Sequence, residues 1–467
     1  MTFYGDDFTG STDALEQLTL AGIRTALFIE PPTSRQFARF ENLQAVGVAG
    51  MTRSLAPAAM ERELRPALKA LKALGAPHVH YKVCSTFDSS PKIGSIGRVI
   101  DIATNIFRAP FVPLLVAAPA LGRYTVFGTH FARFGIGSAG AIHRLDRHPS
   151  ISTHPVTPMT EADLRLHLAK QTIKRIALFD ILKLGAPGSE SQSVLEKILN
   201  DGAEVVLFDA LYQEQLHRIG ELIDGFATSK QPLFSVGSSG IEMALAAHWK
   251  SQGRVAAPID DGHSASASGA FLERKQILVG SGSCSPVTLQ QIDWALKNGF
   301  AEVKLNVGAL VKARNVADEV ERVTKLTAGF LEKGRSVIVH TTTAGADKRA
   351  AAKLKNRVAR VLGTALGHVL RGALEQSSVQ RLCIAGGDTS SFAARALHIE
   401  ALEMIAPLTP GAPLCRAFAP NSPINGREVV FKGGQVGGEN YFGILLRGKS
   451  ERKDAPRDEN ASAPLEL

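Results

Sequence analysis

Cysteine is scarce in this sequence, with four residues among 467. They are too few and too widely spaced for a disulfide framework, and no two stand at the short spacing of a zinc site. We therefore expect a reducing compartment, the cytoplasm, and no resident metal site. The four are Cys84, Cys284, Cys383 and Cys415.

Long hydrophobic runs are also absent. The longest apolar stretch, residues 111–121, holds two prolines and is about half as long as a membrane-spanning helix requires. At the N-terminus, Asp6 and Asp7 stand where an export signal would carry positive charge. We expect no membrane partner, and we predict that residues 111–121 form a buried strand.

Aromatic residues make up only 6% of the chain, while Lys and Arg exceed Asp and Glu by 53 to 44, a net charge of +9. Much of this excess lies in residues 302–360, which hold 13 basic and 6 acidic residues. No aromatic stacking residues alternate with these basic residues, so we expect no nucleic acid partner. From residue 348 to 370 basic and apolar residues alternate at helical spacing, which favours one solvated helix face and leaves a site for an anionic ligand as the alternative.

The composition is otherwise that of a globular protein, with 45% hydrophobic and 21% charged residues. Short apolar runs, such as residues 25–28 and 337–340, are predicted strands and alternate with amphipathic segments, a pattern typical of α/β layering. We predict two α/β domains with largely parallel sheets and a ligand cleft between them. The boundaries we expect are a first domain at 1–249, a Gly/Ser/Ala-rich hinge at 250–270, a second domain at 271–446 and a disordered tail at 447–467.

Two segments have the residue spacing of a nucleotide-binding motif but not the sequence context that such a motif requires. Residues 443–450 fit the P-loop pattern, but the spacer is apolar and no helix follows. Residues 135–140 fit the dinucleotide fingerprint, yet Pro149 cuts short any helix after them. We reject both motifs.

Three loops share a different arrangement, in which a short strand leads through Gly, Ser and Thr residues into a helix. Glycines let backbone approach a ligand closely, and helix N-terminal amides and hydroxyls bind anions. The loops are 237–240 with Ser238, 280–285 with Ser283 and Ser285, and 385–390 with Gly386, Gly387, Asp388 and Thr389. Asp388 suits a Mg²⁺ or ribose contact, with a helix cap as the alternative. The glycine run 432–438, which includes Gly434, is suited to closing over a nucleotide.

In the first half, Asp6 and Asp7 follow the opening strand, at the strand end where α/β folds bind ligands. A carboxylate there can deprotonate a substrate hydroxyl or bind a metal, and the alternative is that one of the two caps the helix that follows. The segment 85–90, which contains Asp88, is dense in groups that bond to hydroxyls. Arg123 suits bidentate capture of a carboxylate, with a surface ion pair as the alternative.

Taken in order, residues 6–10, 85–89, 154–159, 280–285 and 386–389 resemble the four-carbon acid sugar kinase family, and the resemblance spans about residues 3–446. It implies an N-terminal substrate domain, a C-terminal nucleotide domain without a P-loop, and ATP-dependent phosphorylation of a small acid such as threonate, erythronate or a 3-oxo-tetronate. It also implies nucleotide contacts at Ser285, at Gly386 to Thr389 and at Gly434.

The resulting hypothesis is an ATP·Mg²⁺-dependent kinase. We expect the acid to bind through Asp6, Lys82, Asp88, Arg123 and Ser238, and Asp7 to take the hydroxyl proton as the hinge closes. A homodimer is compatible with this hypothesis. The alternatives are an NAD-dependent dehydrogenase of a small hydroxy acid, using the 135–140 loop, and a non-catalytic anion- or nucleotide-binding protein.

Overall fold

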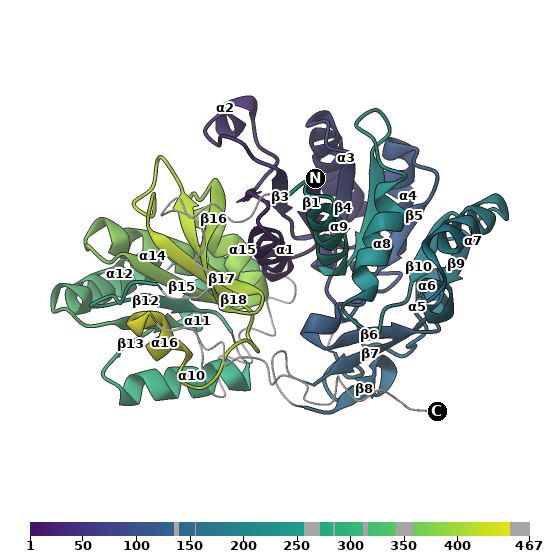
Figure 1. Ribbon diagram of the computed structural model, residues 1–467. Helices are drawn as coiled ribbons and strands as arrows, with labels where there is room; N and C mark the ends of the chain where they lie inside the picture. The colour runs from purple at the N-terminus through teal and green to yellow at the C-terminus, as the bar shows by residue number, and fades with distance from the viewer. Residues whose placement is uncertain are drawn as a thin grey trace, which may run out of the picture.

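The computed structural model describes residues 1–134, 140–154, 156–255, 271–283, 285–311, 316–341 and 358–448. Within this part of the chain, one sheet of 15 strands runs through the whole molecule, in the order β13-β14-β12-β15-β18-β17-β16-β2-β3-β1-β4-β11-β5-β10-β9. Most neighbouring strands are parallel, and the antiparallel pairs are β2–β16, β16–β17 and β17–β18 (Figure 1). The predicted α/β class is confirmed, but the two sheets that we expected are continuous with each other.

The N-terminal half contributes eight parallel strands to this sheet. Helices α1, α7, α8 and α9 pack on one face, and α3, α4 and α5 pack on the other. The strands are β1 (Thr2–Gly5), β2 (Thr25–Phe28), β3 (Ala45–Ala49), β4 (His78–Lys82), β5 (Val112–Leu115), β9 (Ile176–Phe179), β10 (Val205–Phe208) and β11 (Leu233–Gly237). The helices are α1 (Phe8–Leu20), α2 (Ser34–Phe37), α3 (Pro57–Ala73), α4 (Ile96–Phe107), α5 (Leu164–Ala169), α6 (Ile181–Leu184), α7 (Gly188–Asn200), α8 (Gln215–Asp224) and α9 (Gly240–Ser251).

The C-terminal half contributes five parallel strands and an antiparallel hairpin. Helices α12, α14 and α15 cover one face, and α10 and α16 cover the other. The strands are β12 (Leu278–Ser281), β13 (Ala301–Lys304), β14 (Val337–His340), β15 (Arg381–Ala385), β16 (Ala401–Thr409), β17 (Ala412–Phe418) and β18 (Glu428–Lys432). The helices are α10 (Pro286–Lys297), α11 (Val307–Val311), α12 (Val316–Glu332), α14 (Val358–Glu375), α15 (Gly387–Ala396) and α16 (Tyr441–Arg447).

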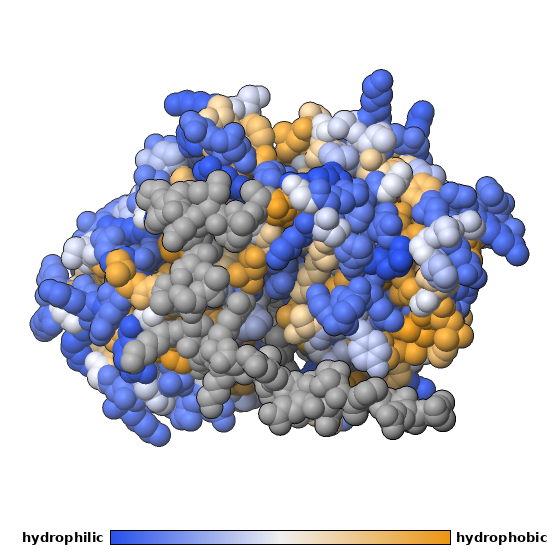
Figure 2. Space-filling model, viewed as in Figure 1, coloured by the Kyte–Doolittle hydropathy of each residue, from blue (hydrophilic) through white to orange (hydrophobic). Residues whose placement is uncertain are grey.

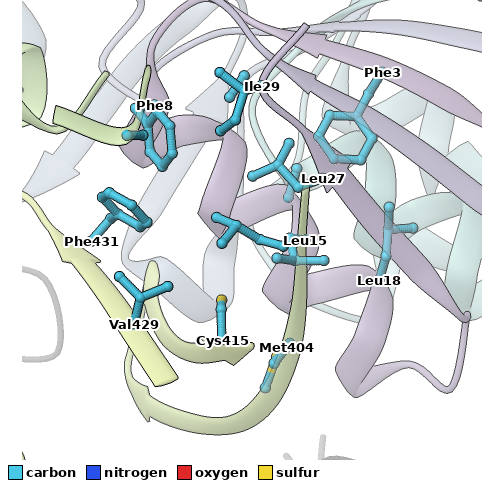
Figure 3. Packing of buried hydrophobic residues seen from close by; sticks show 14 of the residues in the cluster. Phe3, Phe8, Leu15, Leu18, Leu27, Ile29, Met404, Cys415, Val429 and Phe431 are labelled. Atoms are coloured by element: carbon cyan, nitrogen blue, oxygen red, sulfur yellow. The ribbon is translucent and has the colours of Figure 1, made fainter. Parts of the chain in front are cut away.

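The β16–β17 hairpin joins the two halves. Strand β16 pairs antiparallel with β2, with Ala401 opposite Phe28 and Leu402 opposite Leu27. Helix α1 then packs over the junction, where the rings of Phe8 and Phe431 lie 4.4 Å apart between centroids (Figure 3). The same hydrophobic cluster continues into both halves, so the junction is part of the core rather than a contact between finished domains.

Several predicted strands match the structure. Residues 25–28 form β2 and residues 337–340 form β14, as expected, while residues 112–115 of the long apolar run form β5. The hairpin was not predicted, because Pro407 and Pro413 interrupt its pattern. Strand β16 accommodates this segment with register shifts between Met404 and Thr409.

The rejected motifs and the expected hinge can also be compared with the structure. Residues 443–447 of the rejected P-loop match lie in α16, a helix rather than a loop. Helix α9 continues to Ser251, and the rest of the expected hinge from residue 256, like most of the tail, lies outside the described residues. The dinucleotide-like loop at 135–139 lies outside them as well.

The visible surface is mostly polar, with an apolar area on the side where α5 and α6 lie (Figure 2). Exposed apolar side chains there include Leu166, Ile173 and Leu182. Among the helices of the described residues, none has the length and apolar character needed to cross a bilayer. A separate three-stranded sheet of β6 (Arg123–Val126), β7 (Thr129–Arg133) and β8 (Ile142–Arg144) lies beside the N-terminal half.

Candidate functional site

The carboxyl ends of neighbouring parallel strands bring the predicted acid-binding residues together. Asp6 and Asp7 follow β1, Lys82 ends β4 and Ser238 follows β11. Strand β1 pairs with β4 and β4 pairs with β11, so the three ends are adjacent in the sheet. This is the edge at which ligands bind in open α/β sheets.

Asp7 is the N-cap of α1, and both of its carboxylate oxygens have partners. Its Oδ1 accepts a 2.7 Å hydrogen bond from the Gly10 amide, and its Oδ2 accepts one of 2.9 Å from Thr9 Oγ1. The guanidinium of Arg53, which follows β3, also forms an ion pair with Oδ2. Sequence reasoning missed Arg53, although it is a charged residue just after a buried strand.

Asp6 is buried, with 3% of its surface exposed. Its Oδ1 has no hydrogen-bond partner among the described residues. Burial raises the pKa of Asp6 to about 7, although the nearby Arg53 opposes this shift. Asp6 therefore changes its charge in the neutral range, unlike an ordinary aspartate.

Lys82 is buried beside the two aspartates. Its Nζ lies 3.0 Å from Asp13 Oδ2 and donates a 3.2 Å hydrogen bond to the carbonyl of Val83. Burial is the largest single influence on Lys82 and would lower its pKa, but the nearby carboxylates of Asp13 and Glu242 and the hydrogen bond to Asp13 together outweigh burial and raise the pKa. Lys82 is thus a fixed positive charge in a nearly dry site, which suits the binding of an anion.

Asp88 and Arg123 form a second side of this site. Asp88 is buried and accepts a 2.9 Å hydrogen bond from Thr86 Oγ1. Arg123, also buried, donates through Nη1 to three backbone carbonyls, including that of Arg133 at 3.0 Å, whereas its Nε has no partner among the described residues. One edge of the guanidinium therefore fixes the loop, and Nε is left for a ligand.

Ser238 has a structural task in addition to its predicted contact. Its Oγ accepts a 3.0 Å hydrogen bond from the Gly240 amide at the start of α9, and the side chain is completely buried. The same helix start carries Glu242, which was not predicted. Both Glu242 oxygens are buried without a described partner, and burial raises the pKa of Glu242 to about 8. His80 Nε2 lies 3.7 Å from Glu242 Oε1.

Several buried polar atoms around these strand ends lack a described partner. Folded proteins rarely leave such atoms unpaired, and a concentration of them indicates a place where a ligand or ordered water completes the bonding. The atoms are Asp6 Oδ1, Asp13 Oδ1, His80 Nε2, Arg123 Nε, Ser239 Oγ and both carboxylate oxygens of Glu242. Their mix of donors and acceptors fits a small polyhydroxylated acid.

The predicted nucleotide loops also meet, at the carboxyl ends of β12, β15 and β18. Ser283 Oγ accepts a 3.2 Å hydrogen bond from the Ser285 amide, and Ser285 is the N-cap of α10. Gly434 packs so closely on these residues that a Cβ on it would lie 2.6 Å from Ser283 Oγ. Thr288 Oγ1 fixes the glycine run by donating a 2.8 Å hydrogen bond to the Gly434 carbonyl.

The loop after β15 lies against the same place. Gly386 has φ +124°, a backbone conformation that favours glycine, and its amide donates to the Lys432 carbonyl at 2.9 Å. Thr389 is buried, and a Cβ on Gly282 would lie 2.3 Å from its Oγ1. The side chain of Asp388 lies outside the described residues, so its expected ribose or Mg²⁺ contact stays a prediction.

Lys432 is a further buried cation beneath these loops. Its Nζ donates to Thr288 Oγ1 at 3.3 Å, and burial lowers the pKa of Lys432 to about 8. Nearby, Gln291 Nε2 lies 3.0 Å from each of three carbonyls of the glycine run, at positions 436–438. The glycine run 432–438, which is predicted to contact the nucleotide, is therefore held against α10 by these hydrogen bonds.

The two sets of loops face each other across the junction. A Cβ on Gly387, the first residue of α15, would lie 4.0 Å from Asp7 Oδ2 and 3.9 Å from Thr9 Oγ1. The N-termini of α1 and α15 thus approach each other (Figure 1). Helix N-termini attract negative charge, so the place between them is suited to a phosphoryl group.

Comparisons with known proteins agree with this division. Residues 1–245 match the family model described as a sugar-binding N-terminal domain, and residues 278–442 match that of a nucleotide-binding C-terminal domain. The crystal structure of a Salmonella typhimurium LT2 protein superposes with a TM-score of 0.74 at 25% identity, covering 96% of this chain and 98% of that one.

Curated relatives are similar over almost their whole length. The chain is 42% identical to a 3-oxo-isoapionate kinase from Paraburkholderia graminis, covering 96% of this chain and 94% of that protein. It is 30% identical to a 3-oxo-tetronate kinase from Methylobacterium radiotolerans, covering 94% of this chain and 97% of that protein. The two domain matches and these relatives show that the chain belongs to the four-carbon acid sugar kinase family and is an acid sugar kinase.

Proposed function

We propose that the protein transfers the γ-phosphoryl group of ATP to a hydroxyl of a small 3-oxo sugar acid, with 3-oxo-isoapionate as the first candidate and 3-oxo-tetronates as the next. One observation carries this proposal: Gly387 of the nucleotide half lies against Asp7 and Thr9 of the sugar half. A phosphoryl group held at the start of α15 would be next to an acid held at the ends of β1 and β4. Phosphoryl transfer requires little beyond such positioning and charge neutralisation.

The nucleotide binds at Ser283, Ser285, Gly386 to Thr389 and Gly434 in this proposal. Backbone amides and hydroxyls contact its phosphates, and Lys432 adds positive charge beneath them. Mg²⁺ enters with ATP as part of the substrate. Such an ion is usually held by phosphates and one or two carboxylates, and Asp7 is the carboxylate facing the nucleotide loop.

The acid binds at the strand ends of the N-terminal half. Lys82 and Arg123 neutralise its carboxylate, and Asp88 accepts hydrogen bonds from its hydroxyls. The buried atoms without partners at Asp13, Ser239 and Glu242 supply further bonds to a ligand or to ordered water at this edge. Asp6 and Asp7 flank the place of transfer, and this pair supplies the proton acceptor.

The test is an ADP-release assay with ATP·Mg²⁺ across 3-oxo-isoapionate, 3-oxo-tetronates, threonate and erythronate. We expect one of the 3-oxo acids to give the highest kcat/KM. The 3-oxo assignment fails if threonate or erythronate is the better substrate, and the kinase proposal fails if no acid stimulates ADP release. A homodimer, a cytoplasmic location and the lack of a nucleic acid partner stay predictions.

A further inference from the structure

We propose that the open edge of β9 is a dimer interface, at which β9 of one copy of this chain pairs antiparallel with β9 of a second copy. In such a dimer the 15-stranded sheets of the two copies join into one continuous sheet. Strand β9 ends the sheet on the side of the N-terminal half, away from the nucleotide loops. The inference therefore concerns assembly and goes beyond the proposed function.

The two edges of the large sheet differ in chemistry. At the β13 edge, the charged residues Glu302 and Lys304 are exposed and alternate with buried apolar residues. Charged side chains on an edge strand discourage pairing with other chains. At the β9 edge, residues 176–179 are all apolar, and within the described part of the chain β9 is hydrogen-bonded on one side only, to β10. The β9 edge is therefore the one suited to pairing.

Exposed apolar side chains flank β9. Ile173, shortly before the strand, is fully exposed, and Leu182, in α6 shortly after it, is 71% exposed. Leu166 of α5, a helix that contacts β9, is 56% exposed. These residues contribute to the apolar area on this side of the molecule (Figure 2). Contiguous apolar surface of this kind marks a place where another protein surface binds.

The hydrogen bonds of β9 determine which of its residues face outward. The carbonyls of Arg175 and Phe179 each accept a 3.1 Å hydrogen bond from an amide at an end of β10. Because the bonding direction alternates along a strand, the amides and carbonyls of Ile176 and Leu178 point away from β10, towards the open edge. Ile176 and Leu178 therefore each present a donor and an acceptor to an incoming strand.

A two-fold axis at Ala177 satisfies these outward-facing groups. In an antiparallel pair, an outward-facing residue lies opposite another outward-facing residue, and the two exchange both of their hydrogen bonds. With the axis at Ala177, Ile176 of each copy lies opposite Leu178 of the other copy. The two Ala177 residues then form the closely spaced, non-hydrogen-bonded pair, where a small side chain allows the strands to approach.

Charges at the ends of β9 favour the same register. Lys174 precedes the strand and Asp180 follows it, so the axis at Ala177 brings Lys174 of each copy opposite Asp180 of the other. An axis at Ile176 or Leu178 would instead place Lys174 opposite a leucine. Within its own chain, Lys174 lies 2.7 Å from a carboxylate oxygen of Glu204, and Asp180 forms an ion pair with Lys183. The second copy therefore adds an opposite charge to each of these surface pairs.

The first test measures the mass in solution and then crosslinks the axis. Light scattering during gel filtration of the full chain at micromolar concentration should give twice the mass of one chain. Under mild oxidation, Ala177→Cys should form a disulfide between two chains, because the Cβ atoms of a closely spaced pair lie about 4.5–5.5 Å apart. Ser193→Cys, at an exposed position of α7, is the matched control and should stay uncrosslinked, as should the wild type. A monomer, or no crosslink in Ala177→Cys, would overturn the proposal.

The second test removes the apolar contacts around the strand. A variant with both Ile173→Asp and Leu182→Asp should fold, because both side chains are exposed, and its dimer Kd should rise tenfold or more. Leu326→Asp on α12 changes an exposed leucine near the β13 edge and should keep the wild-type Kd. Sedimentation velocity over a range of concentrations measures both variants. A dimer Kd that is the same in both variants would place the interface elsewhere and contradict the proposal.

Hydrogen exchange distinguishes a second copy from a segment of the same chain as the occupant of this edge. The amides of Ile176 and Leu178 should be protected in the dimer and exchange rapidly when the double variant dissociates. If the same amides are protected in a monomer, another part of the chain covers β9, and the proposal is wrong. Thermal unfolding of each variant checks that the fold is retained.

Discussion

Gly387 at the start of α15 faces Asp7 at the start of α1, with 4.0 Å between the position of a Cβ on Gly387 and Asp7 Oδ2. The two residues are 380 positions apart and belong to different halves of the chain. Their proximity places an anion-binding helix end on each side of one small region. If phosphoryl transfer takes place between them, as we propose, the halves do not have to travel far.

Substitution of Gly387 tests whether this region holds the nucleotide. Gly387→Ala should be tolerated, because its Cβ meets neighbours only at ordinary contact distance. Gly387→Val should raise the KM for ATP by about tenfold or more, since a branched side chain would occupy the space at the helix start. Calorimetric titration with a non-hydrolysable ATP analogue checks both variants. Equal affinity in the valine variant and the wild type would move the nucleotide elsewhere.

Removal of Arg53 should change both the rate and its pH dependence. Arg53 forms an ion pair with Asp7 and is the strongest influence lowering the pKa of Asp6. Because the Asp6 and Asp7 pair supplies the proton acceptor in the proposed function, we expect kcat/KM to have an acidic limb, a fall as the pH drops. Arg53→Met should raise the pKa of Asp6 further and move this limb to higher pH. We also expect kcat to fall by about 10²-fold, because a cation near the transferred phosphoryl group is lost. Arg53→Lys, which keeps the charge, should shift the limb less; a limb unmoved in Arg53→Met would contradict the prediction.

Glu242 should make stability depend on pH. Burial raises its folded-state pKa from 4.5 to about 8, so between these values the folded protein holds a proton that the unfolded chain has lost. The free energy of unfolding must then fall as the pH rises from about 4.5 to 8. Glu242→Gln should be less affected, and at pH 8.5 it should be more stable than the wild type by about 1–3 kcal/mol. Urea unfolding at pH 5.5 and 8.5 measures this, with exposed Glu41→Gln as a control that should follow the wild type.

Phe8 tests whether the halves share one core. Its ring packs on Phe431 across the junction, and both side chains are buried. Phe8→Ala should lower the free energy of unfolding by about 3–5 kcal/mol and increase hydrogen exchange in β16, β17 and β18. Leu68→Ala removes a buried side chain on the opposite face of the N-terminal half and should leave exchange in those strands unchanged. Equal exchange in the two variants would argue for independent cores.

The sequence was sufficient to identify residues that end buried parallel strands. Asp6, Asp7 and Lys82 follow or end short apolar runs, and parallel strands bring such ends together at one edge. Arg53 carries the same signal, since it follows β3 closely, but it was not recognised. Glu242 could not be recognised, because Ser239 and Glu242 have the spacing of a capping box, whereas in the structure neither side chain caps α9.

The strand pairing that joins the two halves could not be predicted, for a different reason. Local patterns indicate where a strand forms but not which distant strand it pairs with. Strand β2 and strand β16 are separated by more than 370 residues, and β16 contains a proline and register shifts. The contact between Gly387 and Asp7 follows from this pairing and from the packing of α1, so it could not be foreseen either.

The pairing of β2 with β16 also bears on how this enzyme can be divided. If the chain were cut between residues 256 and 270 and the two pieces made separately, each would expose the backbone of a strand that is now paired. Open, apolar strand edges recruit other chains, so each piece alone would tend to aggregate. Together in one solution, the two pieces would cover each other's edges and could restore a split enzyme.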